Sequence, residues 1–243
     1  MRPPAAALAI LLGLTATPVL AQDFDYETCL NLTTVDPQQA RAMAIAGYAN
    51  TGAYAARHCE ALALAEIGAN RSAAEILQET AQAFDIDDEQ RAELLLQAAR
   101  QWRDYGRPDA ARGALTTGLA YRKAVPLFIE RATLSAEEGQ LQAALDDLNA
   151  ALAIDPNEGE AMALRAAAKR RLGDLGGAYS DAQRAVELGP VSPSAWLELG
   201  KAERAREDKN AARRAWLKAI DVAPSSKAAA LARGELQDMD GGG

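Results

Sequence analysis

The sequence has few residues that could carry chemistry, with one histidine and two cysteines among its 243 residues. This set cannot supply the four ligands of a structural zinc site. A cysteine nucleophile would need a free thiol and a histidine elsewhere in the fold, but His58 and Cys59 are neighbours. On a helix, such neighbours point about 100° apart. We therefore predict no enzymatic activity, no metal and no cofactor.

Positive charge is also scarce, since 26 Lys and Arg face 34 Asp and Glu and the net charge is −8. Nucleic acids and anionic membranes bind basic surfaces, so we expect neither as a partner. Among the acidic residues, Asp146 and Asp147 are adjacent and face different directions on a helix. We interpret them as solvated surface charges rather than paired catalytic carboxylates.

Aromatic residues make up only 5% of the chain, whereas 49% is hydrophobic and alanine is unusually frequent. Alanine has the highest helix propensity, and its small side chain lets helices approach closely. No stretch of useful length alternates between polar and apolar residues as a half-buried strand does. The composition therefore predicts an all-α protein with closely packed helices.

A long apolar run occurs only near the N-terminus. Arg2 precedes an apolar stretch over residues 5–14, and small residues lead to a cleavage site after Ala21. The run is shorter than the roughly 20 apolar residues of a membrane span and has the organisation of a signal peptide. No cysteine stands at the cleavage site, which argues against a lipid anchor. We expect loss of residues 1–21 and a soluble, periplasmic protein without membrane insertion.

The two cysteines, Cys29 and Cys59, remain after this cleavage. In an oxidising compartment an even, isolated pair is typical of one disulfide, although two free thiols stay an alternative. A bond would tie residues 22–36, which we expect to be irregular, onto the helix that carries Cys59. Closing a loop of about 30 residues stabilises a protein by roughly 3 kcal/mol in the chain-entropy account.

The second half of the sequence repeats every 34 residues, as shown by Pro156, Pro190 and Pro224. Small residues stand 24, 12 and 5 residues before each proline, and larger apolar residues stand 28 before it. These positions hold, in that order, Ala132, Ala166, Gly200; Ala144, Ala178, Ala212; Ala151, Ala185, Ala219; and Phe128, Met162, Trp196. Small residues let two antiparallel helices cross closely, and proline ends the second helix because it lacks the N–H donor.

A 34-residue unit with these residue types at these spacings resembles the tetratricopeptide repeat. The resemblance is strongest in two stretches, GQLQAALDDLNAALAIDP at 139–156 and ALRAAAKRRLGD at 163–174. It implies an all-α fold, an α-α superhelix in which helical hairpins stack as a right-handed solenoid. It also implies a protein that works by binding other proteins or peptides.

The repeat pattern divides the chain into regions. Residues 124–225 carry three well-formed units, and residues 37–123 carry weaker, degenerate hairpins. A capping helix is expected over 226–238 and a flexible tail over 239–243. The expected helices span residues 38–50, 53–67, 71–84, 88–104, 108–120, 124–138, 141–154, 158–172, 175–188, 193–206, 209–222 and 226–238.

In the family that this sequence resembles, the first helix of each unit lines the concave face. The resemblance places there two apolar residues, Ile129 and Leu197, and six cations. The cations are Arg100, Arg103, Arg170, Arg171, Lys201 and Arg204. Because arginine bonds carboxylates through two parallel hydrogen bonds, we hypothesise a partner with an acidic segment or a C-terminal carboxylate. The asparagines of the family's carboxylate clamp are missing here.

A structural role stays open for the same cations. They could instead pair with Glu160, Glu203 and Asp104 on their own helices, and such surface pairs contribute only about 0.2–0.5 kcal/mol. The sequence does not distinguish these two roles, and it leaves the oligomeric state open.

The expected function is that of a periplasmic scaffold or adaptor, which holds a partner protein or extended peptide in its groove during cell-envelope assembly. One alternative is a maturation chaperone that presents an apoprotein, as some periplasmic repeat proteins of cytochrome assembly do. Another is an accessory regulator of an envelope hydrolase. The missing catalytic residues make an enzyme the weakest interpretation.

Overall fold

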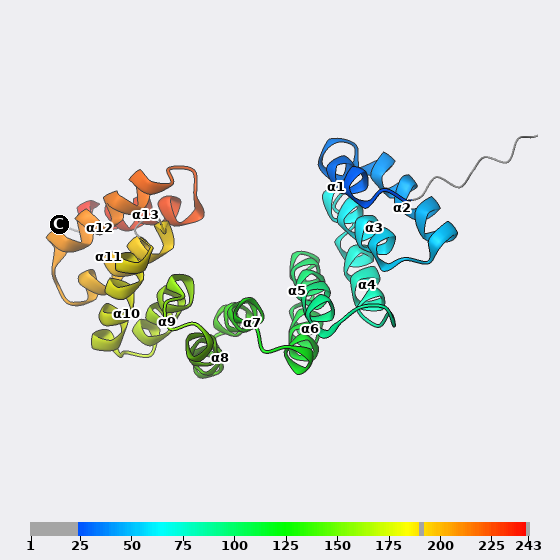
Figure 1. Ribbon diagram of the computed structural model, residues 1–243. Coiled ribbons are helices and arrows are strands. Elements are labelled where there is room, and N and C mark those ends of the chain that lie inside the picture. The colour runs from blue at the N-terminus through cyan, green and yellow to red at the C-terminus, as the bar shows by residue number, and fades with distance from the viewer. Residues whose placement is uncertain (1–23, 190–191, 242–243) are drawn as a thin grey trace, which may run out of the picture.

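The computed structural model describes residues 24–189 and 192–241, and every regular element in these ranges is an α-helix (Figure 1). The helices are α1 (Tyr26–Val35), α2 (Pro37–Thr51), α3 (Tyr54–Glu66), α4 (Asn70–Thr80), α5 (Asp88–Asp104), α6 (Pro108–Tyr121), α7 (Val125–Glu137), α8 (Leu141–Ile154), α9 (Gly159–Arg171), α10 (Leu175–Leu188), α11 (Pro193–Ala205), α12 (Lys209–Val222) and α13 (Lys227–Gly241). Figure 1 shows them stacked along an open arc, with α1–α2 and α12–α13 rising on the same side at its two ends. The predicted all-α superhelix is confirmed.

The helices pack as successive hairpins: α5 with α6, α7 with α8, α9 with α10, and α11 with α12, while α13 packs on the last hairpin. The expected signal peptide, residues 1–21, lies outside the described residues. Within the described part of the chain, no helix has both the length and the apolar character needed to cross a membrane.

Two expectations for the chain ends are wrong. The sequence predicts an irregular segment over residues 22–36, but Tyr26–Val35 forms α1. The Asp25 carboxylate caps its first turn, 3.2 Å from the Thr28 amide nitrogen. The weak helix propensity of its Asn and Thr residues is outweighed by packing, because Cys29 is fully buried against α2 and α3. At the other end, α13 continues through the expected tail to Gly241, since Asp240 forms an ion pair with Arg213 of α12.

The Cys29 and Cys59 sulfurs form a disulfide that joins α1 to α3 across a Cα–Cα distance of 6.2 Å. His58, next to this bond, also connects helices. Its Nδ1 lies 2.5 Å from the hydroxyl oxygen of Tyr26, and its Nε2 lies 2.8 Å from the Gln97 side-chain oxygen. Burial lowers the pKa of His58. Through its two ring nitrogens, His58 connects α3 to α1 and α5.

Each of five turns between helices has one residue in the left-handed backbone region. Gly68, Gly106, Gly139 and Gly173 have φ angles of 76°, 79°, 77° and 88°, and Glu207 has a φ of 70°. Glycine adopts this conformation readily, whereas other residues pay about 1–2 kcal/mol. The turn at Glu207 therefore repeats the conformation of the other turns although its sequence departs from theirs.

The interior of each hairpin depends on small residues at the helix crossing. Ala144, Ala178 and Ala212 are all fully buried. In the last hairpin, Gly200 of α11 faces the fully buried indole of Trp216 on α12, and a Cβ atom at position 200 would overlap this ring. The wide indole therefore requires the absence of a side chain across from it.

Two partly buried ion pairs each join the two helices of one hairpin. Arg131 of α7 donates to both oxygens of Asp147 on α8, at 2.9 and 2.6 Å, and Arg165 of α9 does the same to Asp181 on α10, at 2.7 and 2.8 Å. Burial opposes ionisation of Asp181, but hydrogen bonds from Arg165 and Lys169 outweigh it and lower the pKa of this carboxyl. The expectation that Asp147 is a solvated charge is wrong, because this face of α8 packs against α7.

Replacing Gly200 tests the crossing of α11 and α12. Gly200→Ala should lower the free energy of unfolding by about 1–3 kcal/mol, because the added methyl group displaces the Trp216 ring. Gly113→Ala, in open space on α6, is the matched control and should raise it by about 0.5–1 kcal/mol. Urea denaturation followed by circular dichroism measures both changes in the free energy of unfolding. Equal changes in the two variants would contradict an overlap between the added methyl group at position 200 and the Trp216 ring.

Removing the disulfide tests how far its influence reaches. Cys29→Ala combined with Cys59→Ala should destabilise the N-terminal helices by about 3 kcal/mol, because it frees a closed loop in the unfolded chain. Hydrogen exchange should accelerate in α1–α3 and stay unchanged in α9–α12, since hairpins in a repeat array contact only their neighbours. Uniform acceleration along the chain would show that the array unfolds as one unit.

Candidate functional site

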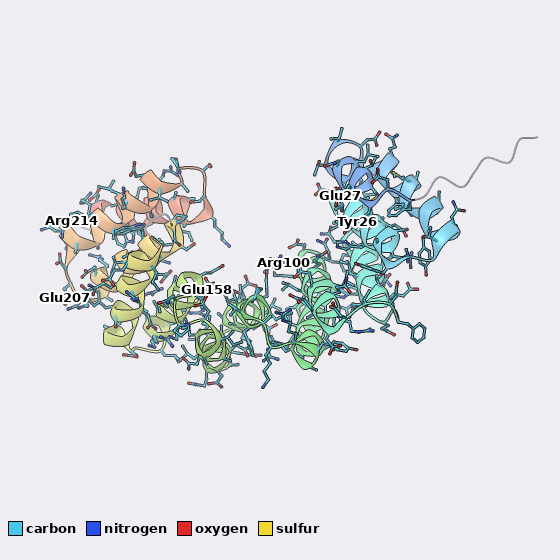
Figure 2. All side chains as sticks on the ribbon, viewed as in Figure 1. Tyr26, Glu27, Arg100, Glu158, Glu207 and Arg214 are labelled. Atoms are coloured by element: carbon cyan, nitrogen blue, oxygen red, sulfur yellow. A yellow bond between two sulfur atoms is a disulfide. The ribbon has the colours of Figure 1, made fainter. Side chains whose placement is uncertain are left out.

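The inner side of the arc is formed by the first helices of the hairpins together with α13. Contacts run from α5 to α7, α9, α11 and α13 in turn, so these helices build one continuous concave face. Figure 2 places Arg100 of α5 and Glu158, just before α9, on this inner side. Because residues three and four apart share a helix face, Glu160, Ala163 and Ala167 all project from the same side of α9.

Two hollows on the concave face are lined by residues that the structure describes. The first, the α5–α7 hollow, has a volume of about 340 Å³, and the second, the α9–α13 pocket, has a volume of about 190 Å³. The α5–α7 hollow is lined by Glu89, Glu93, Leu96, Arg122, Pro126 and Leu127, among others. The α9–α13 pocket is lined by Glu160, Ala163, Ala167, Leu197, Lys227 and Leu231, among others. Of the eight groove residues predicted from the sequence, Leu197 lines one of these two hollows, the α9–α13 pocket.

The first two predicted cations converge on one carboxylate. Arg100 and Arg103 of α5 approach the two oxygens of Glu130 on α7, at 2.6 and 2.7 Å. Arg103 also lies 3.9 Å from Asp104, the longer of its two contacts. The pairing therefore runs mainly between hairpins and braces α5 against α7.

A second carboxylate holds two more of the predicted cations. Glu198 of α11 lies 3.3 Å from Arg170 of α9 and 3.0 Å from Lys201 of its own helix. Sequence reasoning missed both Glu130 and Glu198. They occupy the same place in their repeat units, directly after the apolar groove positions Ile129 and Leu197, and this shared place is the signal that could have found them.

The remaining predicted residues differ in exposure. Ile129 is only 9% exposed and belongs to the core between α7 and its neighbours, which leaves little of it for a ligand. Arg171 is exposed and donates to the Ala136 carbonyl oxygen at 2.9 Å. Arg204 is exposed, and its side chain forms no hydrogen bond or ion pair with any other described residue. Arg171 and Arg204 therefore leave positive charge without a carboxylate partner at the C-terminal ends of α9 and α11.

Negative charge gathers at the opposite end of α9. Glu160 forms no ion pair within the part of the chain that the structure describes, and its amide nitrogen donates to the Glu158 side chain at 3.1 Å. Partial burial and the charges of Glu158 and Glu130 raise the pKa of Glu160, while Arg100 lowers it by a smaller amount. The concave face therefore has an acidic edge at Glu158 and Glu160 and a basic edge at Arg171 and Arg204.

In the described ranges, no group of three or more His, Cys, Asp or Glu side chains is placed to hold a metal ion. The charged residues of the concave face also pair mainly with one another across helices. What this face offers a ligand is shape, apolar surface and the charge of its two edges.

The raised pKa of Glu160 predicts how stability changes with pH. A carboxyl whose pKa is raised in the folded state contributes stability below its unfolded pKa and loses it as the pH rises through the folded pKa. Glu160→Gln should therefore raise the thermal midpoint at pH 7, and this gain should vanish near pH 4. Glu187→Gln, an exposed carboxyl on α10 that pairs with Arg184, is the matched control and should give no such gain. Calorimetry across this pH range measures both midpoints. A lower midpoint for Glu160→Gln at pH 7 would show that the partly buried Glu160 carboxylate does not destabilise the fold.

Comparison with known proteins places the fold. No protein-family model matches the sequence, and no curated protein matches it either. Among solved structures, pilF of Pseudomonas aeruginosa is 13% identical, with a TM-score of 0.65, and the match covers 86% of this chain and 97% of that one. A tetratricopeptide repeat protein from Parabacteroides merdae is 23% identical, with a TM-score of 0.63 and 77% and 73% of the two chains covered.

YrrB, described as a tetratricopeptide repeat protein with an unusual peptide-binding site, is 18% identical, with a TM-score of 0.56. The match covers 79% of this chain and 97% of YrrB. These likenesses extend over most of the hairpin stack. Together with the 34-residue period and the glycine turns, they show that the chain has the tetratricopeptide-repeat fold.

Proposed function

We propose that this protein is an interaction scaffold that holds an extended segment of a partner protein against its concave face. The observation that carries the proposal is the arrangement of this face, a continuous wall of helices with two hollows and charged edges. Such a wall offers an extended chain many contacts at once. YrrB, which shares the fold, is described as having an unusual peptide-binding site, and this supports the same use here.

The charge of the groove favours a partner segment that carries carboxylates. Of the six cations that the sequence predicts for this face, the carboxylates of Glu130 and Glu198 bind four. Arg171 and Arg204 remain available for a ligand. Since a guanidinium binds a carboxylate through two hydrogen bonds, an acidic side chain or a C-terminal carboxylate suits this edge.

We place the scaffold in the bacterial periplasm, in the assembly of the cell envelope. Two features support this location. Residues 1–21 have the organisation of a signal peptide, and the disulfide between Cys29 and Cys59 suits an oxidising compartment. Detection of the mature protein, starting at Gln22, in a periplasmic extract would test it directly.

The basic edge is tested with peptides selected from a random library on the wild-type protein. Arg171→Ala combined with Arg204→Ala should weaken binding of acidic peptides about tenfold, because the charge-assisted hydrogen bonds from these arginines to the peptide carboxylates are lost. The double change leaves no carboxylate of the protein itself without its partner. Arg184→Ala, an exposed arginine on α10, is the matched control and should bind like the wild type. Fluorescence anisotropy measures the affinities, and an unchanged affinity of the double variant would rule out this edge.

A further inference from the structure

The C-terminal helix does more than cover the last hairpin. Its packing onto α11 and α12 uses Ala228, Ala229 and Ala232, which are at most 7% exposed. Leu231 is not needed for this contact and remains 47% exposed, where it lines the α9–α13 pocket. An exposed leucine beside a hollow is apolar surface that a ligand can cover.

The floor of this pocket is apolar. Ala163 and Leu197 are buried at 2% and 4% exposure, and Ala167 is half-buried beside them. The alanines of α9 leave the space that a larger residue at the same positions would fill. With a volume of about 190 Å³, the pocket suits a single large apolar side chain rather than a whole segment of chain.

The rim of the pocket carries unbalanced negative charge. Glu160 stands at the rim with Glu158 beside it, and neither carboxylate forms an ion pair with another residue in the described ranges. Lys227, on the wall formed by α13, reaches neither of them, while Glu198 is occupied by Arg170 and Lys201. A cation brought by a ligand would relieve the repulsion between the two free carboxylates.

We propose that the α9–α13 pocket anchors the partner through an apolar side chain next to a lysine or arginine. The apolar side chain lies on Ala167, Leu197 and Leu231, and the neighbouring cation lies against Glu158 and Glu160. Lys227 is placed to donate to a backbone carbonyl of the same segment. This inference rests on the proposed function, because it names one determinant of the segment that the groove holds.

The anchor also explains the opposite edges of the concave face. A partner segment with a basic–apolar pair at one end and carboxylates at the other would match the acidic edge at Glu160 and the basic edge at Arg204. Such a segment would bind in one direction only, since reversal would bring like charges together.

Filling the pocket tests the apolar part of the anchor. A random-peptide library selected on the wild-type protein should yield Leu, Ile, Met or Phe next to Lys or Arg, and Ala167→Leu should weaken binding of these peptides at least about tenfold. Ala143→Leu, the same change at an exposed position of α8, is the matched control and should leave the affinity unchanged. Circular dichroism verifies that both variants keep their helices. Wild-type affinity of Ala167→Leu would overturn the proposal.

Reversing the rim charge tests the cationic part. Glu160→Gln should weaken binding about threefold to fivefold while making the protein more stable, a combination that a structural role would not produce. A library selected on Glu160→Lys should yield Asp or Glu, instead of Lys or Arg, beside the apolar residue. Selection that ignores the charge of this neighbour would overturn the proposal.

The two proposals fail in different ways. If the Arg171 and Arg204 variant loses binding but Ala167→Leu and Glu160→Gln do not, the groove binds a partner and the anchor is wrong. If the library yields no peptide on the wild-type protein, both proposals are wrong.

Discussion

The structure depends on the close crossing of two helices in each hairpin, made possible by residues without bulky side chains. Ala144, Ala178 and Ala212 are fully buried at these crossings, and Gly200 makes room for Trp216. Because each hairpin then packs on the next in the same way, a small rotation accumulates from one to another. The open arc, and with it the concave face, is the sum of these local contacts.

Charged residues inside this array have two different roles. Arg131 with Asp147, and Arg165 with Asp181, join the two helices of one hairpin. Glu130 and Glu198 instead hold cations of the preceding hairpin and thereby fix the distance between neighbouring units. Cations that already bind carboxylates of the protein are poor candidates for ligand contacts, whereas Arg171 and Arg204 have no carboxylate partner among the described residues.

The concave face separates charge along the direction of its helices. Acidic side chains stand at the first turn of α9, and cations stand at the last turns of α9 and α11, an order that also favours the helix dipole. Between them lie alanines and Leu197, which are too small or too buried to fill the groove. The same separation of charge that favours the helix dipoles would give a bound segment a preferred direction.

The sequence by itself determined the helices and the repeat, because the spacing of alanine, glycine and proline reports on hydrogen bonds and contacts within one hairpin. It also placed Leu197 and the six cations on the first helices. Only the tertiary structure decided that residues 26–35 form a helix, that Asp147 is buried, and that Glu130 and Glu198 neutralise four of the cations. These outcomes depend on side chains that meet across separate helices, and such meetings follow from the packing angle between hairpins rather than from any local pattern.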